Sequence, residues 1–131
     1  MAHYAFLNDD NIVVDVIAGN DETLLDDLPE GFSSWEEWYS NFRGQTCKRT
    51  SINTIGNIHT EGGTPFRGNY AVIGGVYDPE NDIFHHGQPF ESWTLDTNDW
   101  IWKPPVPHPN TIDSNDTHPY TWNETILNWE E

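Results

Sequence analysis

Histidine is the side chain with the most varied chemistry in this sequence, and six occur among 131 residues. His85 and His86 are adjacent on an expected strand, where neighbouring side chains point to opposite faces and form a poor chelate. The other four lack the short spacing of zinc ligands, and the C-x-x-C and H-E-x-x-H patterns are absent. These four are His3, His59, His108 and His118. We therefore expect no metal site.

Carboxylates gather in four short turns, with the sequences NDDN, DPEND, DTND and DSND. Calcium prefers such oxygen ligands, but none of the turns matches the EF-hand loop with its central glycine and terminal glutamate. Asp and Asn are also the ordinary residues of tight turns. Two interpretations therefore stay open, a weak surface calcium site and a purely structural role.

No residue stands out as a catalytic nucleophile. Cys47 is the only cysteine, so no internal disulfide can form, and its place in an expected strand favours a small buried apolar residue. The G-x-S-x-G pattern is absent, and GGTPFRGN lacks the order of a phosphate-binding loop. No carboxylate pair for glycoside hydrolysis can be singled out in so acidic a chain. We expect no catalytic residue, no cofactor and no enzymatic activity.

The chain carries 22 acidic and five basic residues, a formal charge of -17. This charge argues against binding to nucleic acid or to an anionic membrane. It favours solubility, a basic partner surface or a high-salt habitat. The start, MAHYAFLNDD, lacks the basic region of a secretion signal, and no stretch approaches the ~20 apolar residues of a membrane helix.

Four of the five bases, Arg43, Lys48, Arg49 and Arg67, fall within one 25-residue stretch. Glu61 is the only acid between the first and the last of them, so this stretch carries +3 and the rest of the chain -20. One interpretation is that the stretch docks on an acidic neighbour. The other is that these bases pair with acids of the same chain.

The first half of the sequence predicts a hairpin followed by helices. HYAFL and IVVDVIAG flank the turn NDDN and read as two strands. Residues 21–28 predict a short helix ended by Pro29. In SSWEEWYSNFRG, Ser33 or Ser34 can cap a helix that Gly44 ends, and its aromatic residues recur at i, i+3, i+4 and i+7. These aromatic residues are Trp35, Trp38, Tyr39 and Phe42, and they are typical of a packing face.

The next stretch is less regular. Residues 45–51 favour a strand, residues 52–69 a long loop of the kind that is usually functional or flexible, and residues 70–77 a strand. From there one pattern recurs, an aromatic strand, a polar turn and an aromatic or β-branched strand. It appears in VYDPENDIF, SWTLDTNDWIW and YTWNETILNWEE, and more loosely in FLNDDNIVV. Each copy predicts a short hairpin.

We therefore predict a mostly-β (α+β) fold of antiparallel hairpins with one or two short helices near residues 21–42. Residues 1–103 would form the core domain, and residues 104–131 a proline-rich connector and a C-terminal hairpin that could act as an assembly arm. Isolated hairpins are marginally stable, so Trp122 and Trp129 must be covered. Either the same domain or another protein could cover them.

Several stretches together resemble a family of small virion-associated proteins of marine bacteriophages, cyanophages especially. The resemblance extends from Tyr4 to Trp129, and its most specific parts are RGQTCKRTS, GGTPFRGNYA and W-x-L-D-x-x-x-W-x-W-x-P-P-x-P. It implies a virion component and supplies no catalytic residue. The chain departs from the family pattern at residues 72–76 and in a longer stretch at 110–119, which puts partner specificity in doubt.

From these patterns we expect a phage virion structural protein, namely a capsid decoration protein on the major capsid lattice. It would be present in multiple copies, bind other virion proteins, and bind neither nucleic acid nor membrane. One alternative is a tail or tail-fibre component that meets host carbohydrate, and another is a small nonstructural phage enzyme. The expected partner-binding residues are Arg43, Lys48, Arg49, Arg67, Trp93, Trp100, Trp102, Trp122 and Trp129.

Overall fold

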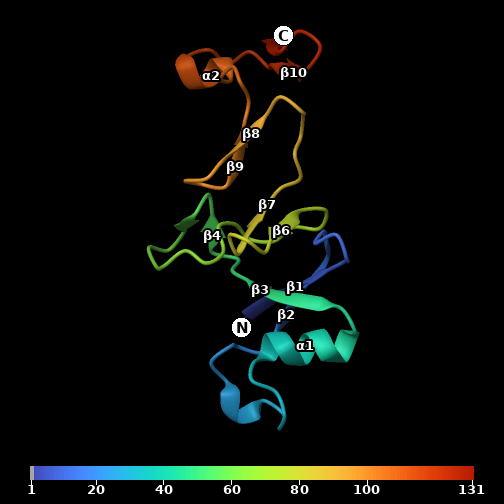
Figure 1. Ribbon diagram of the computed structural model, residues 1–131. Coiled ribbons are helices and arrows are strands. Elements are labelled where there is room, and N and C mark those ends of the chain that lie inside the picture. Colours follow the sequence, from blue (N-terminus) through green and yellow to red (C-terminus); the bar gives the residue numbers. More distant parts are fainter. Residues whose placement is uncertain (1) are drawn as a thin grey trace.

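The computed structural model describes residues 2–131, and short antiparallel strands dominate it, as the sequence predicts (Figure 1). The strands are β1 (Ala2–Leu7), β2 (Val13–Gly19), β3 (Thr46–Thr50), β4 (Thr54–Ile55), β5 (Ile58–His59), β6 (Val76–Asp78), β7 (Ile83–His85), β8 (Thr94–Asp96), β9 (Ile101–Lys103), β10 (Thr121–Asn123) and β11 (Asn128–Glu130). The helices are the 3-10 turn η1 (Leu25–Asp27), α1 (Trp35–Arg43) and α2 (Pro109–Ile112).

The largest sheet has three antiparallel strands in the order β2-β1-β3, and β1 lies at its centre. Side chains of a strand alternate between its two faces. Tyr4 and Phe6 therefore pack under α1, together with Trp35 of that helix. Ala5 and Leu7 point the other way and pack against the β6–β7 hairpin. One buried central strand thus supplies the cores of two layers, which lie on opposite sides of the sheet in Figure 1.

Helix α1 begins and ends where the sequence predicts. The Ser34 hydroxyl accepts a hydrogen bond from the Glu37 backbone N–H at 3.1 Å. The Glu37 carboxylate in turn accepts from the Ser33 N–H at 3.2 Å, so both residues cap the first turn. Gly44 ends the helix in the left-handed conformation with φ of 67°. The predicted aromatic face is confirmed for three residues, but the ring of Phe42 is 73% exposed.

The predicted helix at residues 21–28 is wrong in its extent, because only the single 3-10 turn η1 forms there. The Asp21 carboxylate accepts hydrogen bonds from the N–H and hydroxyl of Thr23, a local turn that competes with helix formation. Leu24 and Leu25 are exposed. The segment therefore has no buried apolar face to stabilise a longer helix.

The predicted strand at residues 70–77 is also wrong in its extent, since only Val76–Asp78 forms a strand. The N–H of Gly75 donates to the Val72 carbonyl at 2.9 Å, which makes a turn in place of the expected strand interior. Gly74 there has φ of 90°, a conformation that suits glycine. The two glycines thus mark a turn.

The recurring sequence pattern forms hairpins in all three C-terminal copies, β6–β7, β8–β9 and β10–β11. Each turn starts with an Asp or Asn whose side-chain oxygen accepts from the N–H two residues later. Each turn also has a left-handed residue four positions after that Asp or Asn. The starting residues are Asp78, Asp96 and Asn123, and the left-handed residues are Asp82, Trp100 and Leu127.

Residues 66–71, at the end of the predicted loop (52–69) and the start of the predicted strand (70–77), run without regular secondary structure through the middle of the molecule. The side chain of Asn69 is buried and accepts from the Gly56 N–H at 2.8 Å. Its amide nitrogen donates to the carbonyls of Phe84 at 2.9 Å and Trp100 at 3.0 Å. One side chain therefore joins the β4–β5, β6–β7 and β8–β9 hairpins. A Cβ on the preceding Gly68 would lie 3.0 Å from the indole of Trp100.

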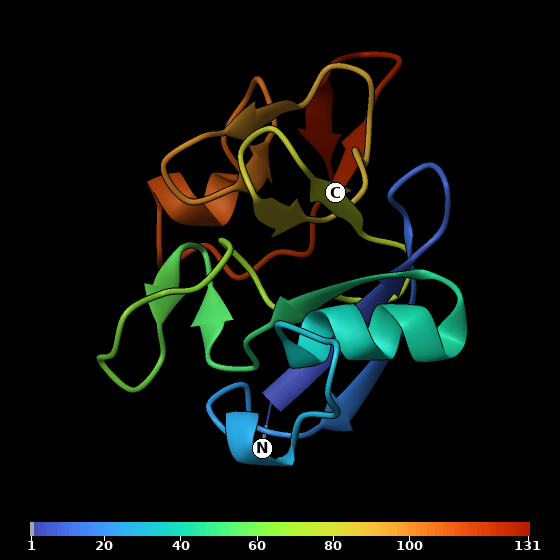
Figure 2. The same cartoon turned by 60° about the horizontal axis from the view of Figure 1, so that its bottom comes forward.

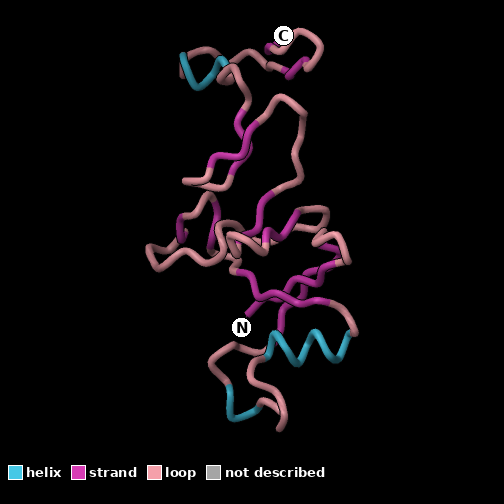
Figure 3. The backbone as a smooth tube through the Cα atoms, in the orientation of Figure 1, coloured by secondary structure: helices cyan, strands magenta, loops and turns pink. Residues whose placement is uncertain are grey.

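The elements follow one another along an elongated molecule, with α1 near one end and the β10–β11 hairpin with α2 near the other (Figures 1 and 3). The three-stranded sheet lies beside α1, and the small hairpins follow in chain order. The C-terminus lies at the far end from α1. In Figure 2 the end of the molecule that carries α1 is turned toward the viewer, and β1 passes behind α1.

We predict that Asn69→Leu lowers the free energy of unfolding by about 3 kcal/mol, because the substitution leaves three buried backbone groups without a partner. Urea denaturation measures the change. Asn41→Leu, at an exposed position of α1, is the matched control and should change stability by about 0.5 kcal/mol or less. Equal effects of the two substitutions would contradict the role given to Asn69.

Candidate partner-binding site

The basic residues predicted to bind a partner all have acidic partners within the chain. The pairs are Arg43–Asp15 at 2.8 Å, Lys48–Glu36 at 3.6 Å, Arg49–Glu22 at 3.4 Å, Arg67–Glu36 at 3.0 Å and Arg67–Asp82 at 2.9 Å. Of the two interpretations of the basic stretch, the structure therefore shows the one in which its bases pair with acids of the same chain. A partner that bound these four bases would have to compete with the existing pairs, and such binding stays a prediction.

Arg67 is the most buried of the four, with a side chain 14% exposed. Its guanidinium also donates to the Arg49 carbonyl at 2.9 Å and lies 4.8 Å from the centre of the Phe66 ring. The same oxygen of Glu36 that binds Arg67 accepts from the Arg49 backbone N–H at 2.9 Å. These contacts fix α1, β3 and the central loop to one another, so Arg67 acts inside the fold.

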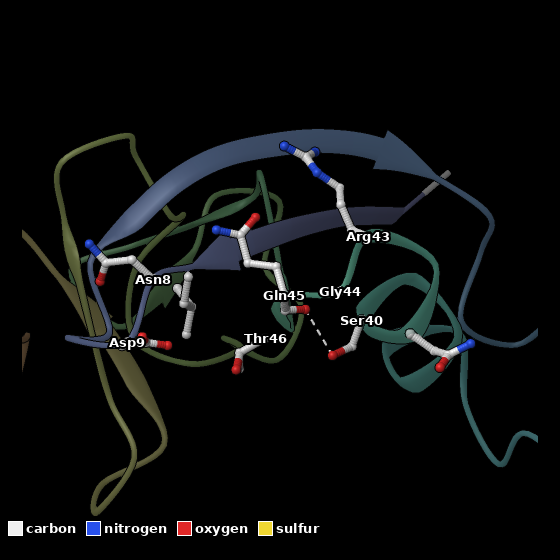
Figure 4. A pocket seen from close by; sticks show the side chains of 9 residues that line it. Asn8, Asp9, Ser40, Arg43, Gly44, Gln45 and Thr46 are labelled. Atoms are coloured by element: carbon white, nitrogen blue, oxygen red, sulfur yellow. Dashed lines mark hydrogen bonds between the residues drawn. The ribbon is translucent and has the colours of Figure 1, made fainter.

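A polar hollow lies between the β1–β2 turn and the C-terminal end of α1 (Figure 4). Its walls include Asn8, Asn41 and Gln45, and Figure 4 shows Arg43 extending toward β2, where it meets Asp15. Hydrogen bonding to Arg43 holds the pKa of Asp15 below its usual range. The hollow is open and its one cation is already paired, so it offers no charge to attract an anion.

Cys47 lies in β3 beneath α1, with 3% of its surface exposed. Burial raises the pKa of its thiol to about 12, and the neighbouring Glu36 carboxylate adds to the shift. Since the thiolate is the reactive form, Cys47 is unsuited to nucleophilic chemistry at neutral pH. The sequence-based interpretation of a small buried residue is confirmed.

Trp100 and Trp102 join the β8–β9 hairpin to the body of the protein. The carbonyl of Trp100 accepts from Asn69, and the indole N–H of Trp102 donates to the His86 carbonyl at 2.7 Å. The ring of His85 meets Trp102 edge-on at 5.6 Å. The indole of Trp102 thus has a partner within the chain, whereas the hydrogen bond of Trp100 is made by its backbone. Both residues line an open pocket beside Gly87.

Trp93, Trp122 and Trp129 form a compact aromatic cluster at the C-terminal end of the molecule. Their ring centres are 5.3 to 6.1 Å apart, and the rings meet edge-on. Trp122 and Trp129 face one another across β10–β11, and Trp122 is 6% exposed. The indole N–H of Trp129 donates to the Val106 carbonyl at 2.8 Å, which holds the proline-rich connector on the hairpin.

The C-terminal hairpin is fastened to residues before β8 by one carboxylate. The two oxygens of Glu124 accept from the Ser92 hydroxyl at 2.6 Å and the Ser92 N–H at 3.0 Å. One of them also accepts from the Trp122 indole at 2.9 Å. These bonds, chiefly the Ser92 hydroxyl, lower the pKa of Glu124. Residues 104–131 therefore fold back onto Ser92 and Trp93, and the domain itself covers Trp122.

A pocket of about 320 Å³ opens beside this cluster, between the indoles of Trp93 and Trp129. Its other walls come from the connector and α2, and they are almost entirely apolar. These residues are Lys103, Pro104, Pro107, His108 and Thr111. The sequence predicted the two tryptophans as binding residues but missed the connector residues, whose closely spaced prolines were the available signal.

Within residues 2–131, no group of three or more His, Cys, Asp or Glu side chains is arranged to hold a metal ion. In the same range, no helix is both long enough and apolar enough to cross a bilayer. Comparison with family models, curated proteins and solved structures found no match to this chain. The functional interpretation therefore depends on the geometry of the chain itself, in which the apolar pocket beside Trp93 and Trp129 is the best candidate binding site.

We predict that Glu124→Ala releases the C-terminal hairpin, because Ser92 and Trp122 lose their shared acceptor. Amide hydrogen exchange in residues 104–131 should become faster, while exchange in β1 stays unchanged. Glu91→Ala is the control, since it removes a nearby carboxylate from an exposed position. Unchanged protection of residues 104–131 in Glu124→Ala would show that the tryptophan cluster alone holds the hairpin.

We also predict that Cys47 resists alkylation in the folded protein, because burial hides the thiol and its raised pKa removes the thiolate at neutral pH. Mass spectrometry after iodoacetamide treatment measures the labelled fraction. Labelling should follow global unfolding as urea is added. Complete labelling within minutes in native buffer would contradict the burial of Cys47.

Proposed function

We propose that this chain is a phage virion structural protein, and specifically a capsid decoration protein that binds the major capsid lattice. Two features of the sequence support the proposal. The sequence resembles small virion-associated proteins of marine bacteriophages. The charge of -17 favours a soluble, monomeric state before assembly and is screened in high salt.

The observation that carries the proposal is the apolar pocket beside Trp93 and Trp129 on an otherwise acidic chain. Tryptophan is enriched where proteins bind tightly to other proteins. The bases at residues 43–67 already have partners in the chain, so we place the attachment surface at the C-terminal end. The elongated shape would then hold α1 away from the lattice (Figure 1).

The copy number of the chain per purified virion tests this proposal. Quantitative mass spectrometry with labelled peptides would measure it against the major capsid protein. We expect on the order of hundreds of copies in a fixed ratio to capsid subunits, since a lattice-bound protein follows the symmetry of the lattice. A few copies to a few dozen would instead place the chain in the neck, tail or fibres. Absence from particles would overturn both structural roles and favour a nonstructural protein.

A further inference from the structure

The pocket beside Trp93 and Trp129 is suited to an apolar side chain. Two indoles and the rings of Pro104 and Pro107 form most of its wall. Such a wall offers few hydrogen bonds to replace those that a sugar hydroxyl loses on leaving water. A compact aliphatic group loses none, so the pocket favours a side chain of leucine or proline size over a sugar.

One polar atom of a lining residue points to a peptide as the carrier of that side chain. The indole nitrogen of Trp93, a lining residue, is a buried donor without a hydrogen-bond partner within residues 2–131. Buried groups of this kind are normally satisfied. A peptide carbonyl supplies the acceptor that this donor lacks.

The pocket wall contains Lys103 and no carboxylate, but the net charge of the C-terminal part of the chain indicates what the flanks of this peptide must carry. Residues 90–131 hold eight carboxylates and one lysine, Lys103, which already pairs with Asp99 at 2.7 Å. An acidic surface attracts a basic partner and repels an acidic one. A second copy of this chain, itself at -17, is therefore a poor occupant.

We propose that this pocket binds an apolar side chain of leucine or proline size on a basic, extended segment of a partner protein. The prolines of the pocket wall restrict the backbone of the connector, and the hydrogen bond from Trp129 to Val106 holds the connector on the hairpin, so binding requires little ordering of the chain. This inference rests on the proposed function only in taking the partner to be a virion protein. The chemistry of the pocket itself does not depend on that role.

Three synthetic peptides test the proposal with the full-length protein. The first has a central Leu-Pro pair with two lysines on each side. The second keeps the lysines around Gly-Ser, and the third keeps Leu-Pro between glutamates. Tryptophan fluorescence reports binding, because two indoles line the pocket. We expect the first peptide to bind at least about tenfold more tightly than either of the others, and more weakly as salt is added.

A substitution that fills the pocket tests the same proposal, and the same new side chain at a neighbouring position is its control. Thr111→Phe introduces a ring at the pocket wall without removing a tryptophan, and Ile112→Phe introduces the same ring at the neighbouring, exposed position of α2. We expect Thr111→Phe to weaken the first peptide about tenfold or more and Ile112→Phe to leave its affinity unchanged. Thermal unfolding confirms that both variants are folded. If both variants bind like the unsubstituted protein, or if the first two peptides bind equally, the pocket is not the site.

The outcomes separate this inference from the proposed function. Selective peptide binding by a chain that is absent from virions would support the pocket and overturn the virion role. A high copy number without selective peptide binding would support decoration and overturn the pocket as the attachment site.

Discussion

The ion pair between Glu36 of α1 and Arg67 of the central loop is the contact on which the rest of the fold depends. Arg67 reaches the helix through Glu36, the sheet through the Arg49 carbonyl and the β6–β7 turn through Asp82. Its own carbonyl accepts from the Phe84 N–H at 2.9 Å. Because the side chain is largely buried, loss of Glu36 would leave Asp82 as the one remaining carboxylate of these pairs to compensate its charge. Arg67 therefore connects α1, the three-stranded sheet and the β6–β7 hairpin.

Buried polar contacts have this prominence because the hairpins are very short. Each of the strands β6 to β11 has three residues, and isolated two-stranded hairpins of that size are marginally stable in water. Apolar cores join the sheet to α1 and to the β6–β7 hairpin. In addition, two polar side chains, Asn69 and Glu124, link one hairpin to the next. Each makes several hydrogen bonds, so each positions more backbone than its size suggests.

Local patterns in the sequence predicted the β1–β2 hairpin, the three C-terminal hairpins, the caps of α1 at Ser34 and Gly44, and the burial of Cys47, since these depend on neighbours in the chain. The β4–β5 hairpin was not predicted, because residues 52–69 were expected to form a loop. The helix expected at 21–28 is reduced to one turn because a local Asp21–Thr23 turn competes with it and no apolar face is buried. The strand expected at 70–77 is shortened because Gly74 and Gly75 form a turn. The partners of Arg67 and Asn69 lie up to 31 residues away. No local period encodes such contacts. The tryptophans could be predicted as binding residues from their type. The pocket could not be predicted, because Trp93 and Trp129 form it together with connector residues that are distant in sequence.

The pairing of the bases also changes where a partner would meet the protein. In the sequence, residues 43–67 look like a basic patch in an acidic chain. In the structure, acids from β2, α1 and the β6–β7 turn take up those charges. Long-range attraction to a basic partner can then orient the whole molecule, but it cannot select one contact point. That selection needs shape and apolar area, and the pocket beside Trp93 and Trp129 combines both at the end of the molecule remote from α1.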